Sequence, residues 1–229
     1  MTGITDIQPS AITRKHGINS PTAERFNYDI YHATTGETPV YIKEGLEDGW
    51  IDGNIAAGTV LNHLGIDAPA THYLEEKDML LIEDLGDVSN IHHAGDETLE
   101  TDESLIDAVL GKYIVGDLDV IQNIMYDGDR FYPIDFDHAG TDIQEAMEKR
   151  PEDIYDQIRD DINLAATFLD GEHVAESDVR ERAATVLHNT EPERLEQLLL
   201  EEERLDQEDA SLYRGNLEYM QDVLRSYGQ

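Results

Sequence analysis

Residues 115–140, VGDLDVIQNIMYDGDRFYPIDFDHAG, carry the side chains with the clearest capacity for chemistry. Asp117 and Asp119 precede Asn123, and Asp135 follows the apolar run that ends at Ile134. Carboxylate and amide oxygens are ligands that hard cations such as Mg²⁺ take in proteins, and a further carboxylate can accept the proton of a hydroxyl group. The alternative is an acidic background, because 51 of the 229 residues are Asp or Glu.

The Asp-Gly pair at 127–128 predicts a β-hairpin inside this segment. A three-residue loop, 128–130, would pair Asp127 with Phe131 and place Asn123 opposite Asp135. Directly opposed residues share one face of a sheet, about 4.5–5.5 Å apart at Cβ, which suits a shared cation. A two-residue loop would direct the two side chains to opposite faces. The metal-site interpretation therefore predicts the three-residue loop.

The whole chain is strongly acidic, with 16 Lys and Arg, a net charge of −35 and a pI near 4.2. Such a charge repels itself strongly in ordinary salt, whereas at 1 M salt screening limits its reach to about 3 Å. We therefore expect an intracellular protein of a salt-accumulating halophile. Nucleic acid is disfavoured as a partner, because contacts with its phosphates need clustered Lys and Arg. The alternative, an acidic mimic of nucleic acid that captures a basic partner, is disfavoured because the carboxylates are spread over the chain.

The chain contains no cysteine, which excludes disulfides, thiolate metal sites and a cysteine nucleophile. With 229 residues and 39% hydrophobic residues it can bury the core of one large domain or two small lobes. No apolar run approaches the roughly 18 residues of a membrane span, and the first residues have no signal-peptide core. These features predict a cytoplasmic protein without a membrane partner.

Strand patterns dominate up to residue 86 and helix patterns follow it. The strands are separated by turn signals such as TTGE, and Gly65 is placed to end the one early helix. Strands are expected at 25–33, 38–45, 68–74 and 78–86, with a helix at 53–65. Later helices are expected at 101–119, 151–169, 190–205 and 210–227. The helix at 190–205 would open with a capping box of Thr190 and Glu193 and a proline in its first turn.

The order of an apolar helix, Asp, Asn, hairpin and Asp resembles the catalytic and metal-binding segments of the protein-kinase-like superfamily. GDLDVIQNIMYDGDRFYPIDFDHAG looks most like HipA-like kinases, with further similarity to phosphatidylinositol 3/4-kinases and aminoglycoside phosphotransferases. TPVYIKEG is similar to the strand that carries the nucleotide lysine, and DMLLIEDLG to the hinge strand. The resemblance covers about residues 12–140. It implies a two-lobed α+β fold, with a small antiparallel nucleotide-binding β lobe at 1–85 and a larger helical catalytic lobe at 86–229.

The resemblance also implies ATP and Mg²⁺ as cofactors and a hydroxyl group as acceptor, on a protein Ser or Thr or on a small molecule or lipid. Lys43 would hold the α/β-phosphates. Asn123 and Asp135 would bind the metal, and Asp119, or else Asp117, would orient or deprotonate the acceptor. Backbone groups would complete the nucleotide site, at Gly17, Asn19 and Ser20 over the phosphates and at Glu83, Asp84 and Leu85 beside the adenine.

Two departures from the superfamily pattern separate the possible functions. The catalytic Asp normally precedes the Asn by five positions, where this chain has Leu118, so Asp119 is one residue nearer and Asp117 one further. The helix segment WIDGNIAAGTVL lacks the usual glutamate partner of the lysine. Either Asp48 or Asp52 substitutes for it, or this ion pair is absent. The first prediction is an ATP- and Mg²⁺-dependent phosphotransferase. The alternative is a pseudokinase or scaffold that binds nucleotide without transfer.

Overall fold

The computed structural model describes residues 12–18, 28–35, 38–91, 103–150, 153–169, 173–188 and 190–227, without the side chains of 13–15. In this part of the chain an antiparallel sheet of five strands comes first, in the order β1-β2-β3-β5-β4. Its members are β1 (Ile12–Ile18), β2 (Asp29–Thr35), β3 (Thr38–Glu44), β4 (Thr71–Leu74) and β5 (Met79–Glu83). The predicted hairpin is the β2–β3 pair, which runs from Asp29 opposite Glu44 to Thr35 opposite Thr38.

Helices make up most of the remaining described residues, as the sequence predicts. They are α2 (Asp48–Leu64), α3 (Glu103–Ile114), α4 (Ile143–Glu148), α5 (Ile154–Phe168), α6 (Glu176–Leu187), α7 (Pro192–Leu199) and α8 (Gln207–Tyr227). A second sheet consists of β6 (Ser89–Asn90), β7 (Ile124–Tyr126) and β8 (Phe131–Pro133). Among the described residues, no helix is long and apolar enough to cross a membrane.

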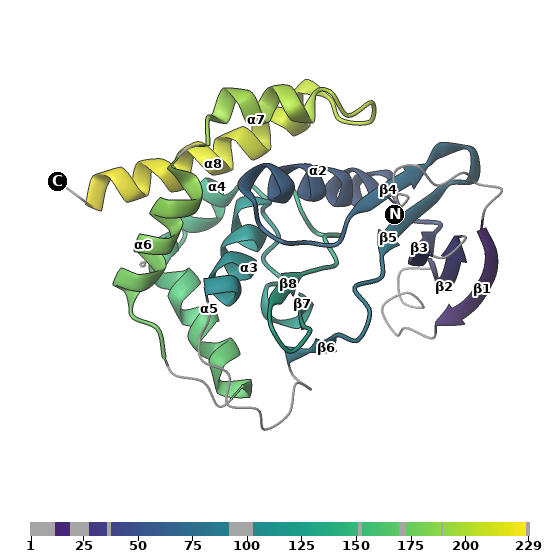
Figure 1. The fold of residues 1–229 in the computed structure, drawn as a ribbon. Coiled ribbons are helices and arrows are strands. Elements are labelled where there is room, and N and C mark those ends of the chain that lie inside the picture. The colour runs from purple at the N-terminus through teal and green to yellow at the C-terminus, as the bar shows by residue number, and fades with distance from the viewer. Residues whose placement is uncertain are drawn as a thin grey trace.

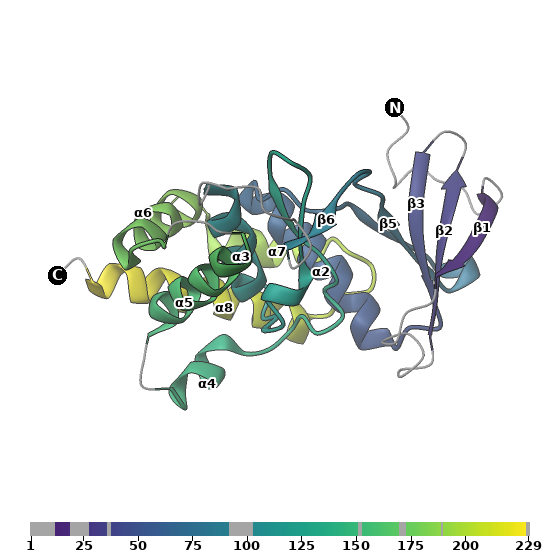
Figure 2. The ribbon, with the colours of Figure 1, turned by 90° about the horizontal axis from the view of Figure 1, so that it is seen from below.

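The five-stranded sheet and the helices form two lobes (Figure 1). Figure 2 shows the same separation from below, with β1, β2 and β3 at one end and α5, α6 and the end of α8 at the other. Helix α2 belongs to both lobes. Its Ile51 packs with Leu80 of the sheet, whereas Val60 and Leu61 join the large core of the helical lobe. This is the expected two-lobed α+β architecture, and the division between residues 85 and 86 stays a prediction.

The ends of helices show where local sequence signals apply. Helix α2 ends as predicted at Gly65, whose φ of 71° is in the left-handed region that glycine adopts readily. The predicted capping box at Thr190 is wrong: the N-cap of α7 is Glu191, without a side-chain bond, and Pro192 opens the helix. The hydroxyl of Thr190 instead donates to the carbonyl of Val186, 3.3 Å away. Strand β1 and helices α4 and α6 lie where the sequence pattern predicts no element.

Candidate functional site

The lysine predicted to bind nucleotide is buried between two aspartates. Lys43 lies on β3 and is 6% exposed, and its amine donates to both carboxylate oxygens of Asp137, at 2.7 and 2.8 Å. A third hydrogen bond goes to Oδ1 of Asp135. The amine also faces the ring of Tyr28, 5.7 Å from its centroid. Lys43 and Asp135, 92 residues apart in the chain, are thus in direct contact, as the predicted site requires.

The three charged groups of this cluster differ in the direction of their pKa shifts and in their exposure. Burial by itself lowers the pKa of Lys43, but the charges of Asp135 and Asp137 outweigh it and raise that pKa above its usual value. Burial raises the pKa of Asp137, and the neighbouring charge of Asp135 adds to that shift. Burial also acts to raise the pKa of Asp135, yet Lys43 lowers it overall. Asp135 is therefore the more readily ionised carboxylate, and at 34% side-chain exposure it is also the more accessible, since Asp137 is 7% exposed.

Helix α2 reaches the lysine through an amide instead of a glutamate. Asn54 donates to Oδ1 of Asp137 at 2.8 Å, and Asp137 in turn holds Lys43. The two carboxylates proposed as substitutes are used elsewhere, because Asp48 and Asp52 both accept hydrogen bonds from Arg204 at 2.8 Å. Lys43 is therefore paired with Asp135 and Asp137 and not with Asp48 or Asp52.

Close packing brings α2 against the segment that carries Asp135 and Asp137. Gly53 has no side chain, and a Cβ there would lie 3.0 Å from the carbonyl oxygen of Phe136 and 3.4 Å from Ala139. Only glycine allows this approach without displacing the neighbouring backbone. The Gly53–Asn54 pair thus connects α2 to the candidate metal-binding segment.

The hairpin register differs from the predicted one. Tyr126 pairs with Phe131 and Ile124 with Pro133, and the N–H of Asp127 donates to the carbonyl of Arg130 at 3.2 Å. The loop therefore consists of two residues, and the prediction of a three-residue loop, with Asn123 directly opposite Asp135, is wrong. Asp127 explains the shorter loop, because its Oδ1 accepts the N–H groups of Asp129 and Arg130, each at 2.8 Å.

A two-residue loop would direct Asn123 and Asp135 to opposite faces only if the strand continued as far as Asp135. Strand β8 ends at Pro133, so this consequence does not apply. Asp135 has a φ of 56°, a left-handed conformation in which the strict alternation of a strand no longer applies. The N–H of Ile134 still donates to the carbonyl of Asn123 at 2.9 Å, which keeps the two segments adjacent. The amide nitrogen of Asn123 donates to the carbonyl of Asp119 at 3.4 Å, so the amide oxygen is the ligand atom that Asn123 can offer.

Asp117 and Asp119 have different environments. Asp117 is fully buried, with Oδ2 bound to the amine of Lys112 at 2.8 Å and Oδ1 accepting the N–H of Asp119 at 3.0 Å. Burial raises the pKa of Asp117, although Lys112 opposes the shift. Asp119 is half-buried and can contact solvent. An acceptor hydroxyl could therefore reach Asp119 but not Asp117.

The predicted nucleotide-contacting backbone is only partly described. Gly17 lies in β1 opposite Tyr31, whereas Asn19 and Ser20 are outside the described residues. The N–H of Glu83 donates to the carbonyl of Ala70 at 2.8 Å, so an adenine would find its donors at Asp84 and Leu85. The carboxylate of Asp84 is bound by His32 at 2.7 Å and by the N–H of Gly86 at 2.8 Å.

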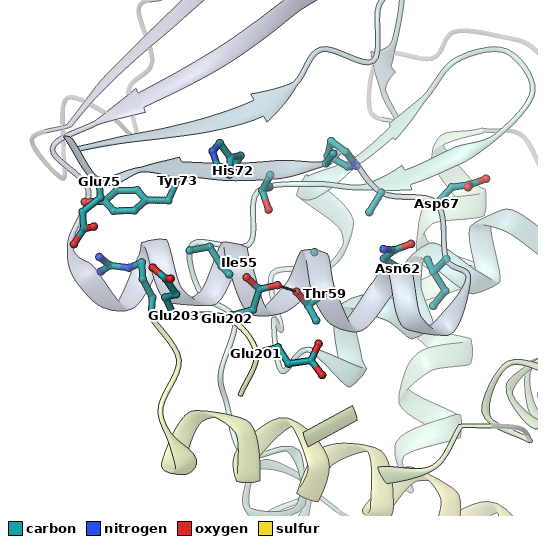
Figure 3. Close-up of a pocket in the computed structure, with 17 residues that line it drawn as sticks. Ile55, Thr59, Asn62, Asp67, His72, Tyr73, Glu75, Glu201, Glu202 and Glu203 are labelled. Carbon is teal, nitrogen blue, oxygen red and sulfur yellow. Dashed lines mark hydrogen bonds between the residues drawn. The ribbon is translucent and has the colours of Figure 1, made fainter. Parts of the chain in front are cut away.

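A cavity of about 680 Å³ lies apart from this cluster, between α2, β4 and the turn at residues 201–204 (Figure 3). Its wall includes Thr59, which donates to Glu202 at 2.8 Å, and Arg204, which lies 4.5 Å from the ring of Tyr73. None of the predicted site residues that the structure describes lines it. The candidate site is therefore defined by its polar cluster and not by this cavity.

Sequence reasoning did not identify three polar residues of the site: Asp137, Asn54 and Lys112. Asp137 was visible as the second aspartate of IDFD, two residues from the predicted metal ligand. Lys112 was visible as one of only five lysines, set in the apolar run AVLGKYIVG. Asn54 gave no comparable signal, because a single asparagine on a helix is an ordinary surface residue.

The donor set suits a magnesium nucleotide. Carboxylate and amide oxygens of Asp135 and Asn123 are hard ligands of the type Mg²⁺ prefers, and Asp135 is both ionised and partly exposed. Lys43 supplies a buried ammonium group on the β-sheet, and an ammonium group binds phosphate as a point charge. Lys43 of the β lobe and Asp135 of the helical lobe thus lie together, as is needed to bind a phosphate and its metal ion at one site.

No protein-family model matches the chain, and a comparison with curated protein sequences gave no match. Solved structures do match. The crystal structure of the Helicobacter pylori proinflammatory kinase CtkA is similar with a TM-score of 0.59 and 10% identity, covering 94% of each chain. The Rio2 kinase of Chaetomium thermophilum, in a complex with ADP/Mg²⁺-phosphoaspartate, gives a TM-score of 0.45 at 12% identity, covering 96% of this chain and 73% of that one. The likeness to CtkA shows that the chain has a two-lobed, protein-kinase-like α+β fold.

Proposed function

We propose that this chain is an ATP- and Mg²⁺-dependent phosphotransferase of the HipA-like kind, which transfers the γ-phosphate to a serine or threonine hydroxyl of a protein. One observation carries the proposal. Lys43 of the sheet is buried against Asp135 and Asp137 of the opposite lobe, so a phosphate-binding cation and a cation-binding carboxylate occupy the same place. The fold shared with a kinase supports the same class of reaction.

To bind a phosphate, Lys43 must give up one of its carboxylate partners, because its donors are all in use. An ammonium group has three N–H donors, and here all three acceptors are carboxylate oxygens, two on Asp137 and one on Asp135. A phosphate oxygen can bind only if one carboxylate leaves. Asp135 is the partner to leave, because it is more exposed than Asp137, which Asn54 also holds.

The remaining residues then have separate tasks. Lys43, still held by Asp137, would bind the α/β-phosphates, while Asp135 and Asn123 would hold Mg²⁺. The metal, when bound, neutralises charge on the β- and γ-phosphates. Asp119 would orient the acceptor hydroxyl and accept its proton, and the backbone of Asp84 and Leu85 would contact the adenine. Such a site works mainly by positioning and by electrostatic stabilisation.

The test is transfer of labelled γ-phosphate from ATP, with Mg²⁺ and at high salt, to the chain itself or to serine- and threonine-containing proteins. Asp119→Asn should bind nucleotide normally and lose about a hundredfold or more in rate, since a general base contributes about 10²–10⁴. Asp135→Asn should bind nucleotide at least tenfold more weakly and should lose transfer. Asp129→Asn is the matched control, because Asp129 lies in the same hairpin and its side chain is 89% exposed.

Equal transfer by the wild type and by Asp135→Asn contradicts the proposal. Magnesium-dependent nucleotide binding by the wild type without any transfer would instead establish the second candidate, a nucleotide-binding pseudokinase. That candidate is motivated by the saturation of Lys43 with carboxylates and by the four-residue spacing of Asp119 and Asn123.

A further inference from the structure

A second buried lysine lies close to the candidate site. Lys112 is on α3 and is fully buried, as are Val109 and Tyr113 of the same helix. Burying a charged amine is costly unless it is paired and its donors are satisfied. The proposed mechanism gives Lys112 no task, so its retention in the core calls for a separate reason.

The three donors of Lys112 join two segments of the chain. Its amine donates to Oδ2 of Asp117 at 2.8 Å, to the carbonyl of Ile134 at 2.7 Å and to the carbonyl of Asp135 at 3.3 Å. The amine also lies 4.6 Å from the centroid of the Phe136 ring. Lys112 therefore holds the backbone at the candidate metal ligand and, at the same time, a carboxylate beside the candidate base.

Asp117 extends this connection to Asp119. Its second oxygen, Oδ1, accepts the backbone N–H of Asp119 at 3.0 Å. On its other side the chain is fixed by Gly116, whose φ is 69° and where a Cβ would lie 2.3 Å from the carbonyl oxygen of Thr141. The orientation of Asp119 thus depends on Asp117, and the orientation of Asp117 depends on Lys112.

Neither member of the pair can touch a reactant, because Lys112 and Asp117 are both 0% exposed. The pair is therefore distinct from Lys43, whose neighbour Asp135 is partly exposed. The described contacts form one continuous path: backbone of Asp135, amine of Lys112, carboxylate of Asp117, backbone of Asp119.

We propose that the buried Lys112–Asp117 pair is a positioning device, which sets the candidate base Asp119 against the candidate metal ligand Asp135. The inference rests on the proposed function for its catalytic consequence. Its structural content, the ordering of residues 117–119 and 134–135 by one buried amine, stands on the hydrogen bonds alone.

A set of three variants tests the inference: Lys112→Met, Asp117→Asn and the double variant. Each single change leaves a buried charge without its counter-ion, so both should lower the melting temperature. The double variant removes both charges, and the amide oxygen introduced at position 117 can still accept the N–H of Asp119, so its melting temperature should recover at least half of the loss. Lys149→Met is the control, because Lys149 is 75% exposed and pairs with Glu145 on the surface.

Two readouts separate positioning from mere stability. Amide hydrogen exchange of the double variant should be at least tenfold faster at residues 117–119 and 134–135 than in the wild type, without nucleotide. In the transfer assay its kcat should fall about a hundredfold, the effect of a misplacement of about 1 Å, while the KM for ATP changes less than fivefold because Lys43 is untouched. A purely structural pair would restore kcat together with the melting temperature.

The outcomes distinguish this inference from the proposed function. Unchanged amide exchange in the double variant overturns the inference whatever the activity. Wild-type kcat in a double variant of restored stability overturns it too, and leaves the proposed function standing. A wild type that transfers no phosphate overturns the proposed function and the catalytic consequence together, while faster exchange would still support the ordering by Lys112.

Discussion

Lys43 of β3 and Asn54 of α2 are joined through one carboxylate. Asp137 accepts two hydrogen bonds from Lys43, at 2.7 and 2.8 Å, and one from Asn54, at 2.8 Å. The sheet and the helix are therefore connected through the segment that also carries Asp135. Movement of α2 would therefore change the surroundings of Lys43 through Asn54 and Asp137.

Removal of the lysine charge should destabilise the fold more than removal of the whole charge pair. Lys43→Met leaves Asp135 and Asp137 facing each other without a cation, and the free energy of unfolding should fall by about 3 kcal/mol. The double variant Lys43→Met/Asp137→Asn should regain at least about 1 kcal/mol of that loss, in chemical denaturation at constant salt. Lys77→Met, at an exposed lysine, should change little. Strictly additive losses would show that the two groups are not coupled.

The contact of α2 with the 136–139 segment should tolerate no side chain. Gly53→Ala places a methyl group 3.0 Å from the carbonyl oxygen of Phe136, and the overpacking cost of about 1–3 kcal/mol should exceed the helix-propensity gain of about 1 kcal/mol. Thermal unfolding should therefore show a net loss. The control is Gly215→Ala in α8, where nothing lies within 4 Å of the new Cβ and stability should rise. Equal gains in both variants would contradict the close approach.

An ion-pair network around the buried Arg180 in the helical lobe predicts a pH-dependent stability difference. The guanidinium of Arg180 donates to Glu176 at 2.6 Å and lowers the pKa of that glutamate below its ordinary 4.5. A depressed carboxyl pKa contributes stability above the ordinary value, and the contribution is lost as the pH falls through the folded-state pKa. Glu176→Gln should therefore cost about 1 kcal/mol at pH 7, with the gap closing below pH 4.5. Glu181→Gln, at an exposed position of α6, should show no such gap. A difference for Glu176→Gln that stays constant from pH 7 to pH 4 would contradict the account.

The net charge of −35 predicts stabilisation by salt. Raising KCl from about 0.1 M to 2 M shortens the screening length from about 10 Å to less than 3 Å, which weakens repulsion among the carboxylates. The melting temperature should rise steeply over this range. Sucrose at equal osmolality should raise it less, because sucrose does not screen charge. A melting temperature independent of KCl would contradict the halophilic interpretation.

Much of the fold could be predicted because apolar periodicity and turn residues are local signals. The β2–β3 hairpin, the end of α2 at Gly65 and the run of helices after residue 103 all follow from such patterns. Helix α6 could not be predicted in this way, since its sequence ESDVRERAATVL is rich in charged residues and buries only a few of its side chains. Strand β1 is polar along most of its length, and its place is set by pairing with β2.

The candidate site was predictable where a motif carries the chemistry and unpredictable where distant segments meet. Lys43 and Asp135 could be proposed from their separate motifs, and the structure brings them into contact. The roles of Asp137, Asn54 and Lys112 arise from tertiary hydrogen bonds between residues 22 to 94 positions apart, for which one sequence holds no signal. The hairpin register was missed because the bonds of Asp127 to its own turn favour the shorter loop.

The most direct test of the central claim is titration calorimetry with a non-hydrolysable ATP analogue, with Mg²⁺ and then with EDTA. The account predicts magnesium-dependent binding by the wild type and by Asp129→Asn, and binding at least tenfold weaker by Asp135→Asn. Absence of binding by the wild type, or binding indifferent to both EDTA and Asp135→Asn, would contradict it.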